Sequence, residues 1–484
     1  MSAAIEGLEP ALVWKHFAAF SKVPRCSKHE AAAAQFILDA AKRFNLQARQ
    51  DAAGNVIVRK PASKGRERRP GVCLQGHLDM VCEKNADKKH DFSKDPIELV
   101  RKGNFLMANG TTLGADNGIA VATNLAIMED TSLEHGPLEL LFTVDEETGL
   151  TGAHHLQAGF VESPILLNLD SEDEGVLYVG CSGGKDTTGA WTIETEAAPA
   201  GSKGIEVKVA GLRGGHSGLE IDKGRGNAIK TLNRVLLALE GVGARLARID
   251  GGNKRNAIPR EATAIVVVPA AKVPAATEIV ATWHETVRHE LASVEPDLRI
   301  TVAPARSRAG SVLKRKFQKG ITRAISALPH GVAKMSADIP GLVETSTNLA
   351  VVTTKGRKVE ISTSQRSSVA SEIIEIAETV KTIFELAGAE VRQGDGYPGW
   401  KPNMDSPILR TAQQTYKALY GKDPAVKAIH AGLECGIIGE KYPGMDMVSF
   451  GPTLEGVHSP DEKIHLDTVP RFYDYLLAIL KNVR

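Results

Sequence analysis

Two adjacent glutamates, Glu146 and Glu147, stand shortly after the apolar segment 138–142. That segment predicts a buried strand, because apolar residues run through it and Pro137 precedes it. Two acids in succession at the end of a strand can face different ways, so that one binds a metal ion while its neighbour reaches a water molecule. Metal-assisted hydrolysis requires this division of work. Adjacent acids are also typical of a solvated loop, so the interpretation depends on other residues.

His77 and Asp79 form a second pattern of this kind, directly after the apolar segment 71–75. An imidazole can bind a metal ion through one ring nitrogen while a carboxylate two positions on orients the ring. A pair on the protein surface is the alternative. Asp170 ends a third apolar segment, 165–169, which also predicts a strand.

Two further residues of ligand type lie near glycines. Asp116 precedes a predicted helix over 117–128, where a helix N-cap is the alternative to a metal ligand. His458 lies in the turn-rich segment 456–462, after a predicted strand at 445–450, and an ordinary loop histidine is the alternative.

The elements that must position these side chains are the predicted strands. His77, Glu147 and Asp170 each lie just beyond the carboxyl end of a strand, and in an α/β sheet those ends meet at one crevice. We therefore expect the three side chains to lie together. Carboxylates and imidazoles without a thiolate suit zinc, and also cobalt or manganese. Five ligands suffice for two ions if one carboxylate bridges them, at the separation of about 3.5 to 4 Å seen in two-metal sites.

The composition limits the kinds of partner. The chain has 484 residues, 59 basic and 58 acidic residues and a net charge of +1. Nucleic-acid binders usually carry a basic excess, so a small-molecule substrate is expected and nucleic acid is not. A length of this order favours two domains over one core.

The cysteines and the start of the chain bear on location. The five cysteines are scattered and form no C-x-x-C pair, so the spacing predicts reduced thiols and no disulfide framework. The first twelve residues lack the pattern of a secretory signal, and no apolar run of about 18 residues occurs. The prediction is a cytoplasmic protein that does not bind membranes.

The predicted elements divide the chain into a catalytic domain and an inserted domain. Residues 1–183 and 397–484 are expected to form the first, an α/β domain with a central mixed sheet flanked by helices. Residues 184–396 are expected to form an α+β lid of two split β-α-β layers. Within the lid, residues 311–328 are predicted to form a helix, and Gly394 to Gly399 mark the return to the first domain.

Together the motifs resemble a known family. The motifs G-H-L-D-M at 76–80, G-A-D-N-G at 114–118, D-E-E-T-G at 145–149, N-L-D at 168–170 and V-H-S-P at 457–460 are similar to those of the di-zinc peptidases, which include aminoacylases, carboxypeptidases and dipeptidases. The chain most resembles the bacterial aminoacyl-histidine dipeptidases (Xaa-His dipeptidases of the carnosine-cleaving type). The resemblance covers nearly the whole chain and includes a long lid.

This resemblance implies roles for the ligand-type residues. It implies two ions that share one aspartate and have two further ligands each: Asp116 between them, His77 and Asp170 on one ion, Glu147 and His458 on the other. It also implies that Asp79 orients His77, and that Glu146 is the general base that moves a proton from the attacking water to the leaving amine.

Four more residues gain expected roles near the substrate. By resemblance, His216 stabilises the oxyanion, often from the partner subunit of a homodimer. Arg366 could grip the substrate carboxylate, since a guanidinium pairs with it in a bidentate way. Asn256 could also bind substrate, and Glu434 could accept its free amine. An ordinary structural, surface or turn residue is the alternative for each of the four.

The expected function is hydrolysis of unblocked dipeptides, preferentially Xaa-His, by a metallopeptidase with two divalent ions. An N-acyl amino acid deacylase or a carboxypeptidase is the alternative among hydrolases, although Glu434 has no partner on a blocked substrate. A metal-binding scaffold without catalysis is the alternative of another class. Loss of Glu146 or of a ligand would mark a scaffold, and the sequence retains them all.

Overall fold

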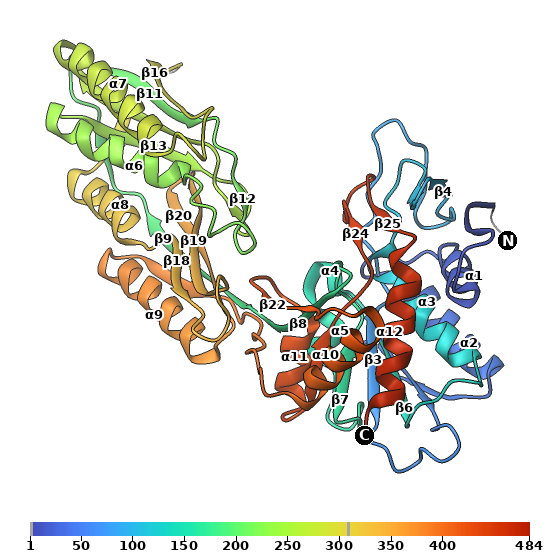
Figure 1. Cartoon of the computed structure of the whole chain (residues 1–484). Helices are drawn as coiled ribbons and strands as arrows, with labels where there is room; N and C mark the ends of the chain where they lie inside the picture. Colours follow the sequence, from blue (N-terminus) through green and yellow to red (C-terminus); the bar gives the residue numbers. More distant parts are fainter. Residues whose placement is uncertain (1–2, 307–309) are drawn as a thin grey trace. The chain divides into compact units, whose positions relative to one another are not determined.

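A computed structural model describes residues 3–306 and 310–484 of the chain. The chain divides into two compact units (Figure 1). Unit 1 comprises Met1–Gly180, Pro402–Ala428 and Leu433–Arg484. Unit 2 comprises Cys181–Lys401 and the short segment Ile429–Gly432.

Unit 1 is built on an eight-stranded mixed sheet. Its strands, in spatial order, are β1 (Gln47–Gln50), β2 (Val56–Lys60), β6 (Leu138–Thr143), β3 (Val72–His77), β7 (Ile165–Asn168), β23 (Asp446–Ser449), β8 (Val176–Cys181) and β22 (Ala425–Ile429). The central strands β6, β3, β7 and β23 run parallel, whereas β1, β2 and β8 pair antiparallel with their neighbours. β3 and β6 are buried along their whole length, which explains their unbroken apolar sequence.

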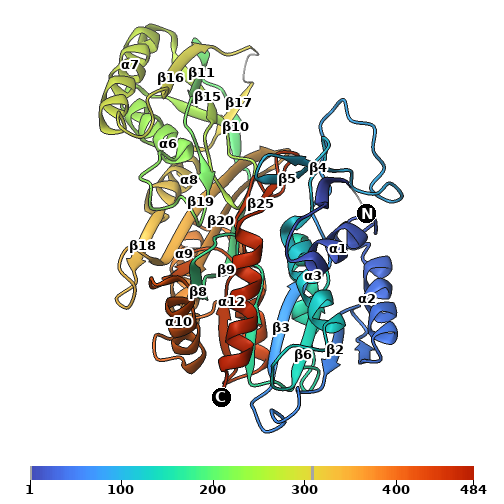
Figure 2. The same cartoon turned by 45° about the vertical axis from the view of Figure 1, so that its right-hand side comes forward.

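Helices cover both faces of this sheet (Figure 2). They are α1 (Ala11–Phe20), α2 (Ala31–Arg43), α3 (Ala115–Glu129), α10 (Pro407–Tyr420), α11 (Glu434–Lys441) and α12 (Thr468–Asn482). A small sheet of β24 (Leu454–Glu455), β25 (Lys463–His465), β5 (Phe105–Ala108) and β4 (Leu99–Lys102) lies beside them. The predicted α/β class with a flanked mixed sheet is confirmed.

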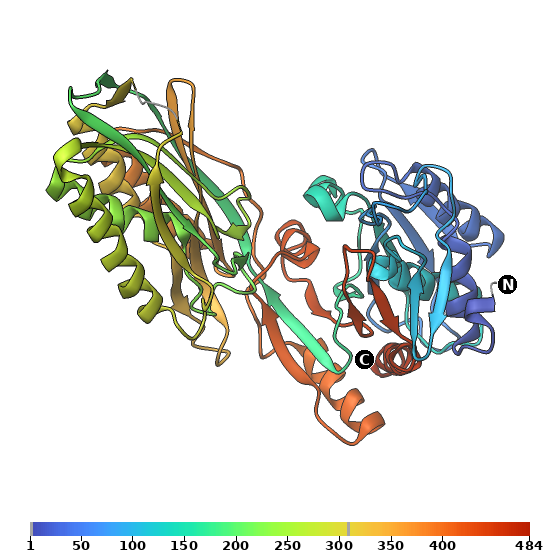
Figure 3. The same ribbon diagram turned by 90° about the horizontal axis from the view of Figure 1, so that it is seen from above.

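Unit 2 contains one nine-stranded antiparallel sheet. Eight strands follow the order β16 (Arg299–Pro304), β11 (Ser202–Ala210), β15 (Ala262–Pro269), β13 (Arg245–Gly251), β19 (Val343–Lys355), β20 (Lys358–Ser367), β9 (Gly183–Thr192) and β21 (Glu390–Gln393), and β18 (Gly331–Met335) pairs with β19. Four helices line one face of it: α6 (Ala228–Leu239), α7 (Val273–Glu290), α8 (Arg315–Ala327) and α9 (Ala370–Leu386) (Figure 3).

The two expected β-α-β layers are the halves of this sheet. They join where β13 meets β19, at the single pair Gly251 and Val352. One expected element is wrong in part: residues 311–313 form strand β17, which pairs with β10 (Thr195–Ala197), and the helix begins only at Arg315. The pairing of β17 with a segment more than a hundred residues away is not visible in local periodicity.

The expectation of reduced thiols throughout is wrong for one pair of cysteines. Cys26 and Cys82 form a disulfide, with their Cα atoms 5.6 Å apart. They are 56 residues apart in sequence, and a β-bridge between Cys26 and Met80 brings the two segments together. The spacing alone could not show this contact. Cys73, Cys181 and Cys435 are buried and lie outside the disulfide.

In the described part of the chain, no helix has the length and apolar character needed to cross a membrane.

Candidate metal centre

Three adjacent parallel strands of the unit 1 sheet, β6, β3 and β7, place side chains at their carboxyl ends. His77 is the last residue of β3 and is paired in register with Thr143, the last residue of β6. Glu146 and Glu147 then open the short helix α4 (Glu146–Gly149). Asp170 follows the end of β7, on the other side of β3. The convergence expected from the sequence therefore arises because β6, β3 and β7 are adjacent and parallel.

Asp116 and His458 come from loops that reach the same edge. Asp116 lies in the first turn of α3, two residues after the N-cap residue Gly114, and its backbone is not helical (φ −82°, ψ 108°). Its two carboxylate oxygens face His77 and His458. The N-cap of α3 is therefore Gly114 and not Asp116. His458 lies between β24 and β25 and has a positive φ of 61°.

Asp116 contacts both imidazoles, each through a different oxygen. Its Oδ1 lies 3.2 Å from Nε2 of His77, and its Oδ2 lies 3.2 Å from Nε2 of His458. Nε2 of His77 is also 3.3 Å from Oδ1 of Asp170, and Nε2 of His458 is 2.8 Å from Oε2 of Glu147. The five side chains therefore form two groups of three that share Asp116.

The donor set fits divalent cations. A single imidazole nitrogen can donate at most one hydrogen bond, yet each Nε2 here faces two carboxylates. In addition, Oε1 of Glu147 and Oδ1 of Asp170 are buried and accept no hydrogen bond from the described residues, although Oδ1 of Asp170 lies 3.3 Å from His77. In each group the potential ligand atoms lie within 4.8 Å of one another. Imidazole and carboxylate groups this close together are typical ligands of zinc and related ions.

The pKa shifts show that the centre carries excess negative charge. Hydrogen bonds to Asp116 and Glu147 raise the pKa of His458 to about 11. Burial lowers the pKa of His77, but Asp170 and Asp116 outweigh it and raise that pKa well above its usual value. Burial raises the pKa of Asp170 to about 6. Cations bound among these groups would relieve the repulsion between carboxylates.

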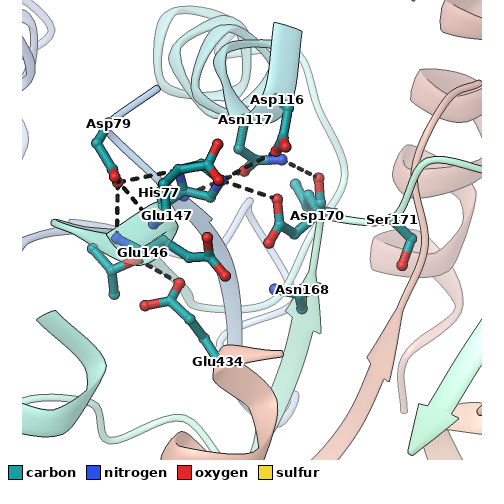
Figure 4. A network of polar contacts seen from close by, with 12 residues as sticks. His77, Asp79, Asp116, Asn117, Glu146, Glu147, Asn168, Asp170, Ser171 and Glu434 are labelled. Atoms are coloured by element: carbon teal, nitrogen blue, oxygen red, sulfur yellow. Dashed lines mark hydrogen bonds and ion pairs between the residues drawn. The ribbon is translucent and has the colours of Figure 1, made fainter. Parts of the chain in front are cut away.

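Asp79 connects His77 to the helix of the two glutamates (Figure 4). Its Oδ1 lies 3.2 Å from Nδ1 of His77 and accepts a 3.0 Å hydrogen bond from the backbone N–H of Glu146. Its Oδ2 accepts from the N–H of Glu147 at 3.2 Å and from Oγ of Ser27 at 2.8 Å. Despite burial, the close contact with His77 and the charge of that ring lower the pKa of Asp79 to about 2. Asp79 is therefore an ionised, fixed group behind the ring.

Glu434, at the start of α11, is fully buried near Glu146 (Figure 4). Its Oε2 accepts hydrogen bonds from Nε2 of Gln75 at 2.6 Å and from Oγ1 of Thr143 at 2.7 Å. Its Oε1 has no donor within the described residues. Burial raises the pKa of Glu434 to about 7. One oxygen is thus held in place while the other is free to accept.

The other three predicted residues belong to unit 2. Nε2 of His216 lies 3.5 Å from Nη2 of Arg366, whose Nη1 donates to the Tyr397 hydroxyl at 2.9 Å. Nδ1 of His216 accepts the backbone N–H groups of Gly218 and Leu219, so in the neutral ring the proton is on Nε2. Burial, with the charge of Arg366, lowers the pKa of His216 to about 4. The ring is therefore neutral near pH 7.

Arg366 is 6% exposed, and within residues 3–306 and 310–484 its guanidinium contacts Ser217, Tyr397 and His216 but no carboxylate. His216 and Arg366 thus present two N–H donors side by side. Asn256 lines the same pocket as His216, of about 460 Å³, but its side chain is exposed and its backbone oxygen accepts from the N–H of Ser217.

Sequence reasoning missed three residues that support the centre. Gln75 contacts Glu434, Arg25 donates to the backbone oxygen of Gly114, and Glu462 accepts the backbone N–H of Asp116. Arg25 lies close to the predicted motifs only in space, and Gln75 and Glu462 are separated from their partners by 359 and 346 residues. No local signal marks them.

Peptidase family M20/M25/M40 matches residues 73–482. The chain belongs to this family. The resemblance drawn from the five motifs is therefore confirmed, and membership implies an enzyme that hydrolyses peptide bonds and binds divalent metal.

Two relatives match along almost their whole length. The cytosol non-specific dipeptidase of Escherichia coli (strain K12) is 42% identical over 478 residues, which are 98% of each chain. The crystal structure of the aminoacylhistidine dipeptidase from Vibrio alginolyticus superposes with a TM-score of 0.92 at 42% identity, covering 100% of this chain and 99% of that one. The aminopeptidase PepT from Bacillus cereus shares the fold, with a TM-score of 0.57 at 15% identity over 98% of this chain and 99% of that one.

Proposed function

We propose that this protein is a metal-dependent dipeptidase that hydrolyses unblocked dipeptides, with Xaa-His dipeptides such as β-alanyl-histidine as preferred substrates. The observation that carries the proposal is the sharing of Asp116 between two imidazole–carboxylate groups, in a chain that belongs to a peptidase family. Two relatives at 42% identity support the substrate class, since both are named dipeptidases. One is named a non-specific dipeptidase and the other an aminoacylhistidine dipeptidase, so rates on β-alanyl-histidine and on other dipeptides measure the histidine preference.

The proposed cofactor is a pair of divalent ions, zinc before cobalt or manganese. Asp116 would bridge them, with His77 and Asp170 on one and Glu147 and His458 on the other. Bound there, the ions would polarise the scissile carbonyl and make a water molecule more acidic.

Glu146 is the proposed general base. Burial raises the pKa of Glu146 well above its usual value, and the charges of Asp170 and Glu434 add to this. Such a carboxylate can take a proton from the attacking water and then give it to the nitrogen of the leaving amine. Asp79 would keep the His77 ring in its binding orientation through Nδ1.

Glu434 is the proposed acceptor for the free amine of the substrate. Its buried Oε1 lacks a donor among the described residues, and an ammonium group would supply one. This contact would discriminate against N-acylated substrates, which carry no ammonium, and so against the deacylase alternative.

His216 and Arg366 are the proposed donors for the oxyanion and for the substrate carboxylate. The paired N–H groups and the absence of a carboxylate partner for Arg366 in the described chain support these roles. Asn256, in the same pocket as His216, would add a contact to substrate.

The arrangement we propose is a catalytic domain, residues 1–183 and 397–484, with residues 184–396 as its inserted lid. We further propose a homodimer in which the partner's His216 serves each catalytic site. A cytoplasmic location is proposed because the Escherichia coli relative is named a cytosolic enzyme.

The test compares unblocked dipeptides with their N-acetylated counterparts, using wild type and Glu434→Gln. Wild type should hydrolyse the unblocked set faster by about 100-fold or more, because a blocked amine leaves a buried carboxylate without its partner. Glu434→Gln should lose most of this discrimination. Glu440→Gln, an exposed position on the same helix, is the matched control and should behave like wild type. Equal rates on free and acetylated substrates by wild type would reject the dipeptidase in favour of the deacylase.

A further inference from the structure

Glu462 makes an unusual set of hydrogen bonds beside the metal centre. Its Oε2 accepts the backbone N–H groups of Leu113 at 2.7 Å and Gly114 at 2.9 Å. Its Oε1 accepts those of Ala115 at 2.7 Å and Asp116 at 3.2 Å. One carboxylate therefore holds four consecutive backbone donors, the last of which belongs to the residue shared by the two metal groups.

The charge of Glu462 is buried, since only 2% of the residue is exposed. A buried carboxylate is costly unless hydrogen bonds and an opposite charge compensate it. The four N–H groups of residues 113–116 supply the hydrogen bonds. The buried guanidinium of Arg25, which interacts electrostatically with Glu462, supplies the opposite charge. Arg25 also donates to the backbone oxygens of Gly114 at 2.6 Å and Asp79 at 3.2 Å. The same backbone segment is thus held from both sides.

Glu462 is also tied to His458, four residues earlier. Its N–H donates to the backbone oxygen of Ser459, and Oγ of Ser459 donates to the backbone oxygen of Gly456 at 2.6 Å and accepts the N–H of Asp461 at 3.2 Å. These bonds close a compact turn around His458. A single side chain therefore connects the turn that presents His458 to the backbone that presents Asp116.

We propose that Glu462 is a positioning residue that sets the spacing between the Asp116 carboxylate and the His458 imidazole. It governs the affinity of the metal group formed by Asp116, Glu147 and His458 more than that of the group formed by His77, Asp116 and Asp170. The inference rests on the proposed two-ion centre.

A purely structural helix cap is the competing role, and it makes a different prediction. A cap stabilises the fold without selecting between metal sites. Ser406 offers the matched comparison, because it caps α10 in the same unit by accepting the N–H of Leu409 at 3.0 Å. Removing that cap should lower stability and leave metal binding unchanged.

The experiment titrates metal-free protein with Zn²⁺ against a chromophoric chelator and follows Co²⁺ spectra of the same samples. The variants are Glu462→Gln, which keeps the shape but replaces one accepting oxygen with a donor, Glu462→Asp, which keeps the charge on a shorter side chain, and Ser406→Ala. Wild type should bind two equivalents. Glu462→Gln should bind one equivalent normally and the second at least about tenfold more weakly. Its kcat should fall while its KM stays within about twofold.

The outcomes separate the two proposals. If wild type does not bind two equivalents of Zn²⁺, the proposed two-ion centre is wrong. Two equivalents in wild type, with unchanged affinities in both Glu462 variants, would overturn the positioning role. If Glu462→Gln does not fold, Glu462→Asp decides alone: selective weakening of one equivalent supports the inference, and equal weakening of both, or none, contradicts it. Ser406→Ala should melt at a lower temperature and keep both affinities.

Discussion

At the scale of single residues, the two oxygens of Asp116 organise the centre, because each faces a different imidazole. Glu147 pairs with His458 at 2.8 Å, whereas Glu146 lies near His77 and Glu147, with one potential ligand atom of each within 4.8 Å of the others. The two adjacent acids are thus divided between binding and proton transfer in the account proposed above.

Replacing Glu146 with Gln should lower kcat by about 10² to 10⁴-fold, because the amide cannot take a proton from water. The variant should still bind two equivalents of Zn²⁺, since Glu147 and the other proposed ligands remain. Steady-state kinetics and metal analysis on the same preparation would check both expectations. Glu162→Gln, at an exposed position outside the centre, is the control. Unchanged turnover in Glu146→Gln would show that another group is the base.

The ligand-type residues could be recognised in the sequence because each adjoins a strand or helix whose apolar pattern is local. Glu462 and Gln75 were not visible, because an acid or an amide acquires its role from partners hundreds of residues away. The roles of His216, Arg366 and Asn256 remain predictions from resemblance, now accompanied by the contacts within unit 2.

At the scale of elements, the order β6, β3, β7 explains why one sheet edge gathers the chemistry. Apolar runs bounded by turn residues predicted these strands, since buried parallel strands have that signature. Strand β17 and the Cys26–Cys82 contact were missed because both depend on pairing between distant segments.

The disulfide lies next to the residues that hold Asp79. Cys26 is flanked by Arg25 and Ser27, which donate to the backbone oxygen and to the carboxylate of Asp79.

Because two of the five cysteines form the disulfide, protein purified without reductant should show three reactive thiols after denaturation and five after reduction. A thiol-reactive chromophore measures both numbers.

Five thiols before reduction would contradict the pairing in the isolated protein. Counting the alkylated thiols of this protein in cells that are alkylated during lysis tests the proposed cytoplasmic location. A reducing cytoplasm keeps most thiols free, so all five should then be alkylated.

At the scale of the whole molecule, the proposed homodimer makes a specific prediction for mixed subunits. His216→Ala and Glu146→Gln should each be nearly inactive alone. A purified heterodimer of the two should recover about half of the wild-type rate, because one of its two sites would combine an intact Glu146 with an intact His216 from the other subunit.

The control pairs Glu146→Gln with Glu434→Gln. Both changes lie in unit 1, so neither site of this second heterodimer would have both residues intact. Its rate should therefore not exceed that of the Glu434→Gln protein alone. No recovery in the first heterodimer would place His216 in the site of its own chain and remove the reason for expecting a dimer.

The proposed two-ion dipeptidase is tested by hydrolysis of β-alanyl-histidine and other unblocked dipeptides by metal-stripped protein, before and after Zn²⁺ is added back. Two bound ions should be required, so activity should vanish on stripping and return as the second equivalent binds. Cleavage restored only for dipeptides without histidine would keep the mechanism and reject the histidine preference. Full activity in verified metal-free protein, or no activity with two equivalents bound, would contradict the account.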